Sequence, residues 1–278
     1  MVYDGSLEGL FAVLDGVLLG APLPDRIRLV SGAYSPAMAG SKNPIQGDLF
    51  GVEDAGNTFL LKGTDPASFF ESEGGAAKEL STVSADAFDT FIYGWMSEIP
   101  IAAELVRFAW KVISAARLGG RGSLDVIGST EARRAAGLAA SDRGDPAAEA
   151  ALSAAFKVCR EIDRLRGLLR FTPDSIGAYT ALCAPDHFVL PGLAEHFSLR
   201  FGGIPWAVID EKRRLALICS DDGYPRLIPA PRQSIQKADA WVNLWRSYHI
   251  SISNESRRNP LLQKRFMPLR YRNYLNEL

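Results

Sequence analysis

The chain has 278 residues, of which 47% are hydrophobic and 23% are charged, and its formal net charge is −1. This composition is typical of a folded globular protein and excludes a disordered chain, and the length allows one large domain or two smaller ones. The cysteines are widely spaced and odd in number, which argues against a disulfide framework and favours a reducing, cytoplasmic setting. They are Cys159, Cys183 and Cys219.

No membrane-targeting signal is evident in the sequence. The N-terminal stretch "MVYDGSLEGLF" lacks the basic and apolar parts of a signal peptide. No apolar run reaches the roughly 18 residues that a membrane-spanning helix needs. We therefore expect a cytoplasmic protein that has no membrane partner.

The N-terminal part of the chain predicts a short strand followed by a helix that Ser6 caps. The apolar side chains of this helix recur at the spacing of one buried face: Leu7, Leu10, Phe11 and Leu14. "NTFLLK" is typical of a strand, and "TDPASFFESEGG" of a helix that Asp65 and Pro66 start and the glycines 74–75 end. These elements define a mixed α/β region over residues 1–95.

The middle of the chain, residues 96–172, has the apolar periodicity of helices. "SEIPIAAELVRFAWKVISAARLGG" predicts one long helix, and the Ala- and Arg-rich stretch 129–144 is either another helix or a poorly ordered insertion. A strong helix follows from Asp145 and Pro146. Its expected buried side consists of Phe156, Cys159, Ile162, Leu165 and Leu169.

The remaining residues, 173–278, predict an antiparallel sheet closed by helices. "LLRFTPDSIGAYTALCAPD" indicates two strands around a turn, and "PWAVIDEKRRLALICSDDG" a hairpin with a charged turn at Glu211–Arg213. Between them we expect a helix that stops at the glycines 202–203. We predict an α+β fold, whose three regions can also form one continuous domain.

Charge is distributed unevenly along the chain. Residues 237–278 carry eight basic and three acidic side chains and so a charge of +5, which leaves −6 for the other 236 residues. The basic segment contains these candidate phosphate-binding and stacking residues: Arg257, Arg258, Gln263, Arg270 and Tyr271. Two interpretations remain open, a surface that binds a polyanion and a solvated face whose aromatic rings anchor the segment.

A second group of arginines lies in "KVCREIDRLRGLLRF". Arg160 and Arg164 are one helical turn apart, and Arg166 and Arg170 form another such pair. Two adjacent arginines can hold a phosphate, or they can pair with the acids beside them in weak surface ion pairs. Arg160, Arg164 and Arg170 are our candidates for nucleic-acid binding here.

The histidines suggest acid/base chemistry more than metal binding. Asp186, His187 and His196 are the candidate catalytic residues, because imidazole titrates near neutrality. Their spacing matches no zinc signature, and each histidine can also be a capping or core residue. We expect no metal and no cofactor.

Common catalytic motifs are missing from the sequence. It contains no G-x-x-x-x-G-K-[ST] phosphate loop, no G-x-G-x-x-G, no G-x-S-x-G and no H-E-x-x-H. The sequence therefore gives no support for assigning the chain to the ordinary nucleotide hydrolases, dinucleotide enzymes, serine hydrolases or zinc proteases.

Five motifs, taken in order, resemble one bacterial protein family. They are "YDGSLEGL", "VCREIDRLRGLLRF", "APDHFVLPGLAEHF", "PWAVIDEKRR" and "RRNPLLQKRFMPLRYRNYL". The chain resembles the family of DNA metabolism or DNA repair proteins encoded beside a radical-SAM protein of DNA modification or repair. In some relatives the module is fused to a uracil-DNA glycosylase domain. The resemblance implies a role in DNA metabolism and a radical-SAM partner.

The resemblance also singles out positions of this sequence. Among the residues already named, it singles out Arg160, Arg164, Arg170, Arg270, Asp186, His187, His196, Gln263 and Tyr271. Its motif residues also include Asp4, Gly5, Ser6, Glu161, Asn259 and Pro268. Two positions depart from the family pattern. Asp163 stands where relatives usually have histidine, which removes a candidate acid/base group, and Arg272 stands where they usually have tryptophan, which makes the segment more basic.

Three functional hypotheses follow. The first is a nucleic-acid-binding accessory module that acts on DNA with the radical-SAM partner. The second is a protein-interaction subunit that docks on that partner. The third is an enzyme that processes DNA or a nucleotide with Asp186, His187 and His196. The sequence favours them in this order and leaves open whether the chain is a catalyst.

Overall fold

The structure of the chain is a computed structural model, and it describes residues 2–3, 6–25, 27–29, 59–60, 75–120, 127–173, 177–230, 247, 251, 259, 261–262, 267, 269–272 and 274–275. The chain divides into two compact units. Unit 1 comprises residues 1–39, 61–162 and 186–192, and unit 2 comprises residues 40–60, 163–185 and 193–278. Each unit is thus assembled from separate stretches of sequence. The three regions that we expect from sequence, 1–95, 96–172 and 173–278, stay a prediction.

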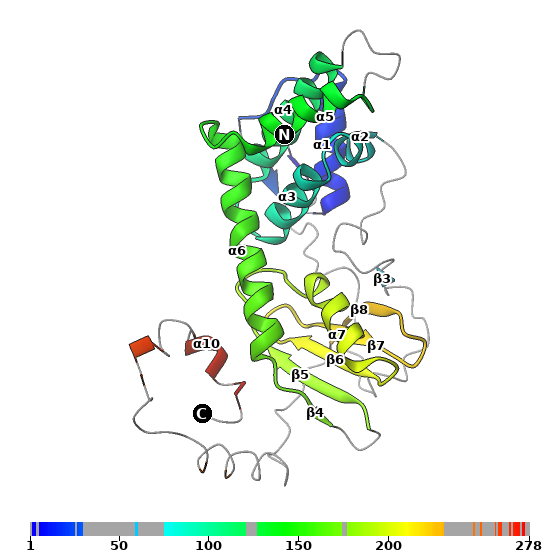
Figure 1. Cartoon of the computed structure of the whole chain (residues 1–278), viewed down its shortest axis with the longest axis vertical. Coiled ribbons are helices and arrows are strands. Elements are labelled where there is room, and N and C mark those ends of the chain that lie inside the picture. Colours follow the sequence, from blue (N-terminus) through cyan, green and yellow to red (C-terminus); the bar gives the residue numbers. More distant parts are fainter. Residues whose placement is uncertain are drawn as a thin grey trace. The chain divides into compact units, whose positions relative to one another are not determined.

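Unit 1 is built mainly from helices (Figure 1). They are α1 (Leu7–Leu18), α2 (Gly75–Val83), α3 (Ala85–Met96), α4 (Ala102–Gly119), α5 (Thr130–Ser141) and, up to Ile162, α6 (Pro146–Leu168). Two short strands, β1 (Val2–Tyr3) and β2 (Arg28–Leu29), pair in parallel.

Helix α1 forms as the sequence predicts. The Ser6 hydroxyl accepts a hydrogen bond from the Gly9 N–H at 2.8 Å, which satisfies one of the free donors of the first turn. The predicted apolar face is buried at Leu7, Leu10, Phe11 and Leu14. The aromatic ring of Phe11 stacks on that of Phe91 in α3, with ring centroids 4.7 Å apart.

Helix α2 begins at Gly75, where the sequence pattern predicts the end of a helix. The Asp15 carboxylate of α1 accepts a hydrogen bond from the Ala76 N–H at 2.6 Å and so caps α2 from another helix. Gly75 has a φ of +65°, and a Cβ there would lie 2.7 Å from Asp15 Oδ1. Only glycine fits this position. The expected helix that starts at Asp65 lies outside the described residues.

The Ala- and Arg-rich stretch is a helix, which decides between the two alternatives left open above. The Ser129 hydroxyl caps α5 by accepting from the Ala132 N–H at 3.2 Å. A row of small side chains is buried on one face: Ala132, Ala136 and Ala140. The helix approaches α4 closely, since a Cβ on Gly119 would lie 2.8 Å from the Ala135 Cβ.

Helix α6 corrects one sequence prediction. Ile162, Leu165 and Leu169 are buried as expected, but the Phe156 side chain is 60% exposed. Each helical residue turns by about 100°, so Phe156, nine residues before Leu165, is about 180° away from it. Steps of three residues drift around the helix. Val158, seven residues before Leu165, is buried instead.

Unit 2 is built around a mixed sheet with the strand order β3-β8-β7-β6-β5-β4 (Figure 1). The strands are β3 (Phe59–Leu60), β4 (Thr172–Pro173), β5 (Tyr179–Cys183), β6 (Trp206–Asp210), β7 (Leu215–Cys219) and β8 (Pro225–Pro229). Helices α7 (Ala194–Phe201) and the short α10 (Leu269–Arg272) belong to this unit, as does the end of α6 from residue 163. A 3-10 turn (Pro191–Leu193) precedes α7.

The two predicted strand pairs are confirmed. β4 pairs with β5 and β6 with β7, both antiparallel, and every residue of β6 and β7 is buried. The sheet also contains a parallel pair, β5–β6, whose crossover includes α7. Helix α7 ends at Gly202, whose φ is +60°. The fold is α+β, as predicted.

Candidate functional site

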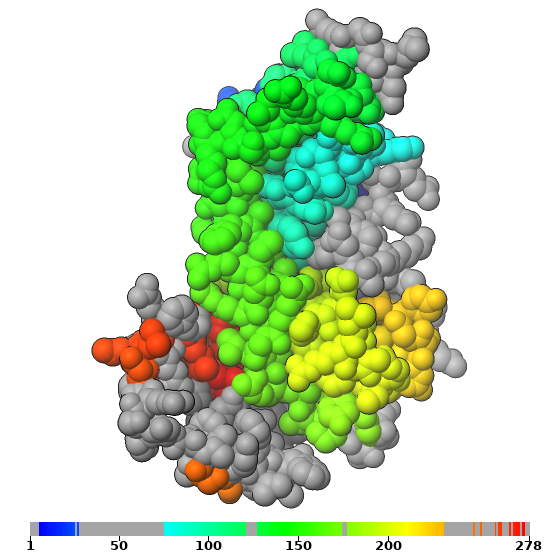
Figure 2. All heavy atoms as spheres, viewed as in Figure 1, coloured from blue at the N-terminus to red at the C-terminus, as the bar shows by residue number. Residues whose placement is uncertain are grey.

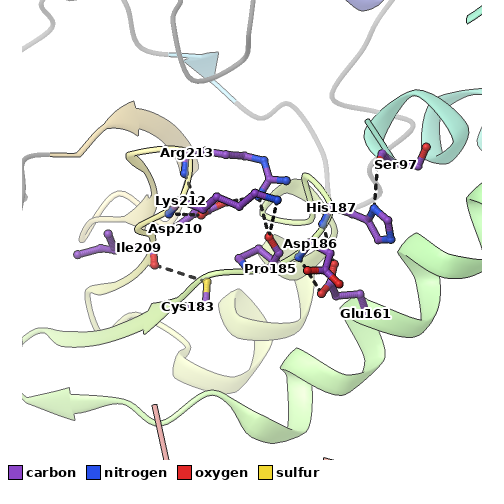
Figure 3. Close-up of polar contacts among 10 residues, drawn as sticks. All are labelled: Ser97, Glu161, Cys183, Pro185, Asp186, His187, Ile209, Asp210, Lys212 and Arg213. Atoms are coloured by element: carbon purple, nitrogen blue, oxygen red, sulfur yellow. Dashed lines mark hydrogen bonds and ion pairs between the residues drawn. The ribbon is translucent and has the colours of Figure 1, made fainter. Parts of the chain in front are cut away.

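The motif residue Glu161 is a buried carboxylate that holds a loop of unit 1 (Figure 3). The Glu161 side chain extends from α6, and the residue is only 2% exposed. Oε1 accepts a hydrogen bond from the Asp186 N–H at 3.0 Å, and Oε2 accepts one from the His187 N–H at 2.8 Å. Both carboxylate oxygens therefore serve the backbone of the loop. Glu161 acts as an anchor for the two candidate catalytic residues.

The His187 ring is oriented by the C-terminal end of α3 (Figure 3). Its Nδ1 lies 2.7 Å from the Ser97 carbonyl oxygen, and the Phe188 N–H donates to the Met96 carbonyl at 2.9 Å. The last carbonyls of a helix lack partners within the helix, so this loop satisfies two of them. Because a carbonyl oxygen only accepts, Nδ1 carries the proton, and Nε2 of the neutral ring keeps its lone pair.

The structure brings Asp186 and His187 together and assigns His196 to the other unit. Asp186 is exposed and His187 is half-buried, and together with Ser97 and Glu161 they form what we call the His187 cluster. His196 is on α7, where its ring makes an edge contact with Phe197 at 4.9 Å between centroids. The sequence offered no signal for Ser97, which contributes a backbone carbonyl.

The pKa of His196 is lower than that of an ordinary histidine. Burial lowers the pKa of its imidazole, and the positive charges of Arg166 and Arg200 lower it further. The neutral ring is therefore favoured in the folded protein.

In unit 2, a buried ion pair holds the β6–β7 turn. Asp210 is 0% exposed, and its Oδ2 accepts from Arg213 Nη1 at 2.7 Å. Asp210 Oδ1 also accepts from the N–H groups of Lys212 and Arg213, at 2.9 and 3.1 Å. Burial raises the pKa of Asp210, and the Arg213 guanidinium opposes that rise.

The same arginine ties the turn to the end of β5. Arg213 Nη1 donates to the Pro185 carbonyl at 3.2 Å, and Lys212 Nζ reaches the same oxygen at 3.4 Å (Figure 3). We call these residues, with Asp210, the Arg213 cluster. The sequence indicated only a charged turn here. The buried position of Arg213 follows from the two acceptors that it satisfies, which no local pattern reveals.

The basic C-terminal segment is anchored to this turn. The Tyr274 hydroxyl donates to Glu211 Oε2 at 2.6 Å. Burial, and then this hydrogen bond, raise the pKa of the Tyr274 phenol. Tyr271 is buried, and the Arg270 guanidinium lies 4.8 Å from the centroid of its ring. For these residues the anchoring interpretation of the aromatic side chains holds.

The other candidate nucleic-acid residues differ in exposure. Arg160 is exposed, Arg164 is half-buried, and Arg170 donates to the carbonyls of Gly167 and Leu169 at 3.0 and 3.4 Å. Asn259 is exposed, and its Oδ1 accepts from the Leu262 N–H at 2.9 Å. Several candidates lie outside the described residues: Asp4, Gly5, Arg257, Arg258, Gln263 and Pro268.

Among the described residues, no three His, Cys, Asp or Glu side chains gather as metal ligands. Within the same part of the chain, no helix has both the length and the apolarity to cross a membrane.

The family of the chain emerges from comparison with known proteins. No curated protein and no solved structure matched the chain. Residues 129–277 match a family described as a domain of unknown function, DUF4130. The matched stretch begins at the residue that caps α5 and includes α6, the Glu161 anchor and strands β4 to β8. It covers more than half of the sequence, and the chain belongs to the DUF4130 family.

Proposed function

We propose that this protein is a nucleic-acid-binding accessory module of DNA metabolism or repair that acts with a radical-SAM partner enzyme. The observation that carries the proposal is the separation of charge between the units. Unit 2 contains 18 basic and 13 acidic residues and carries +5, whereas unit 1 contains 13 and 19 and carries −6. A compact positive unit in an overall neutral chain favours a polyanionic ligand.

Unpaired basic side chains support a phosphate-binding role. Arg164 and Arg214 have no carboxylate partner within the described part of the chain. Arg214 is exposed at the tip of the β6–β7 hairpin, next to the turn that anchors the basic C-terminal segment. Such cations remain available for phosphate oxygens.

The buried clusters favour an accessory role over catalysis. Glu161 uses both carboxylate oxygens to hold the backbone of the loop, and Asp210 is neutralised by Arg213. The carboxylates of Glu161 and Asp210 are therefore engaged in holding the fold. The partner assignment rests on the five sequence motifs, which resemble proteins encoded beside a radical-SAM protein.

The test is fluorescence anisotropy with labelled single- and double-stranded DNA over a salt series. The proposal predicts binding that weakens steeply with salt, because bound cations displace counterions from phosphates. An Arg257/Arg258/Arg270→Ala variant should lose most of this binding. A matched variant that removes three charges from unit 1, Arg133/Arg134/Arg143→Ala, should keep it. Absence of binding by the intact protein at low salt contradicts the proposal.

The C-terminal segment also supports a second candidate function, docking on the partner protein. Leu261, Leu262 and Leu269 are all exposed there. A docking role predicts that charge reversal at Arg270 and Arg272 abolishes the complex with the radical-SAM protein and leaves DNA affinity unchanged. Co-purification and anisotropy on the same variant separate the two functions.

The geometry of His187 supports a third candidate, an enzyme that processes DNA or a nucleotide. Its Nδ1 is held by Ser97, so Nε2 faces away from this bond as a proton acceptor. Asp186 lies beside it in the chain, in the same unit. This function predicts a product from damaged or undamaged oligonucleotides that disappears in the His187→Gln variant.

A further inference from the structure

Helix α6 presents an aromatic ring to solvent in unit 1. Phe156 is 60% exposed on a helix whose opposite side is closely packed, with Ala151, Val158 and Ile162 all buried. Figure 2 shows that much of α6 forms part of the molecular surface. Exposing a large aromatic ring to water is unfavourable, and burying it under a ligand would recover that free energy. The residues around the ring indicate which ligand could bind there.

The surroundings of this ring are cationic. The Arg160 guanidinium lies 5.6 Å from the Phe156 centroid, and Lys157 is exposed at the next position. Within the described part of the chain, neither Arg160 nor Lys157 has a carboxylate partner. Residues 150–160 contain no acid, and the next acid, Glu161, is buried. An aromatic plane is thus combined with two available positive charges.

We propose that Phe156, Arg160 and Lys157 form a stacking site for an unpaired nucleobase. The base stacks on the exposed face of the Phe156 ring, and the two cations bind the phosphates on either side of that nucleotide. Base–aromatic stacking and cationic phosphate contacts are the two components of single-strand recognition. This inference rests on the proposed function and deepens it, because it selects single strands over duplexes.

The flat ring and the two cations together favour a nucleotide over a protein as the ligand. An acidic protein surface would match the two cations, but the flat ring offers no pocket for a side chain anchor of a protein partner. A nucleotide supplies a planar π system and an anion together. A protein ligand remains an outcome that the test can reveal.

The test compares variants of the full chain by anisotropy with a labelled single-stranded oligothymidylate and a duplex of equal length. Phe156→Ala should weaken single-strand binding by roughly 5- to 150-fold, the range that loss of one stacked base produces. Phe156→Trp should keep single-strand binding, since indole also stacks. Duplex binding should be the same in all three proteins.

A matched control excludes a general effect of removing exposed apolar surface. Leu138, on α5, is 65% exposed, so Leu138→Ala should leave both affinities unchanged. Arg160→Gln should lower the salt dependence of single-strand binding by about 0.7 in the log–log slope, the amount for one phosphate contact. Circular dichroism checks that every variant is folded.

Photo-cross-linking places the site directly. After irradiation, an oligothymidylate that carries 5-iodouracil should form an adduct with a peptide that contains Phe156. Mass spectrometry identifies the cross-linked peptide. Single-strand binding that is equal in wild type and Phe156→Ala overturns the inference and leaves the proposed function standing. Absence of any nucleic-acid binding overturns both, and an adduct elsewhere in the chain overturns the inference alone.

Discussion

Arg160 and Glu161 are consecutive residues of α6 whose side chains have opposite environments: Arg160 is exposed beside the Phe156 ring, and Glu161 is buried under the Asp186–His187 backbone. The Arg-Glu pair of the sequence motif therefore has two separate roles. Glu161 stabilises unit 1, whereas Arg160 is available to a ligand. Variants at the two positions should affect different measurements, stability for Glu161 and binding for Arg160.

Substitution of Glu161 by Gln should destabilise the protein. Glutamine keeps one acceptor but sets an amide N–H₂ against a backbone N–H, so we expect a loss of about 2 kcal/mol in the free energy of unfolding. Urea denaturation of the variant and of wild type measures this difference in the free energy of unfolding. The control is Asp163→Asn, two residues further along α6, whose exposed ion pair with Arg166 contributes little. Equal stability of the Glu161→Gln variant and wild type would show that the anchor has no energetic role.

Each single substitution in the buried Asp210–Arg213 pair should destabilise the protein strongly, whereas replacing both residues together should cost less than the two single changes added. Asp210→Asn or Arg213→Met leaves one buried charge without its partner and should cost about 3–5 kcal/mol. Replacing both residues should cost less than the sum of the two single changes. The comparison is Asp222→Asn, which removes an exposed partner of Arg226 and should cost about 0–1 kcal/mol. Additive costs at Asp210 and Arg213 would argue against a coupled pair.

His196 should titrate below the ordinary range of histidine. Burial and the charges of Arg166 and Arg200 lower its pKa, so the folded protein binds this proton less readily than the unfolded chain. The stability that the neutral imidazole contributes is therefore fully present above the pKa of histidine in the unfolded chain, and it is lost as the pH falls from there through the lower pKa of the folded protein. NMR titration of the imidazole measures the shift. Arg200→Gln should raise the pKa, while Arg143→Gln in unit 1 should not change it.

In its neutral form, the His187 ring should be the Nδ1–H tautomer. The Ser97 carbonyl is 2.7 Å from Nδ1 and can only accept a hydrogen bond. Nitrogen-15 chemical shifts of the ring distinguish the two nitrogens, and we expect Nε2 to have the shift of an unprotonated nitrogen. A protonated Nε2 in the neutral ring would be incompatible with the hydrogen bond to Ser97 and with a base at this position.

Local patterns predicted much of the fold. The cap at Ser6, the β6–β7 hairpin and the end of α7 at Gly202 follow from side chains within a few residues of each other. Helices α2 and α3 were missed. The reason at α2 is a cap from Asp15, which is 61 residues from Ala76 in sequence. A helix start that depends on a distant side chain has no local signal.

The candidate site was predicted less well, because its residues act through backbone groups. Asp186 and His187 were selected for their side chains, yet the contacts that position them are the backbone N–H groups that Glu161 binds and the carbonyl of Ser97. Backbone partners leave no trace in composition. Phe156 was assigned to the buried side because steps of three residues drift around a helix, and the error concealed the one aromatic ring of α6.

The interleaving of the two units limits how this protein can be divided. The matched family region starts at residue 129, yet α5 packs on α4, which ends before that point. A fragment that begins at the family boundary would keep the alanine face of α5 and lose the helix that covers it. The matched stretch of sequence thus contains only part of the compact unit to which α5 belongs.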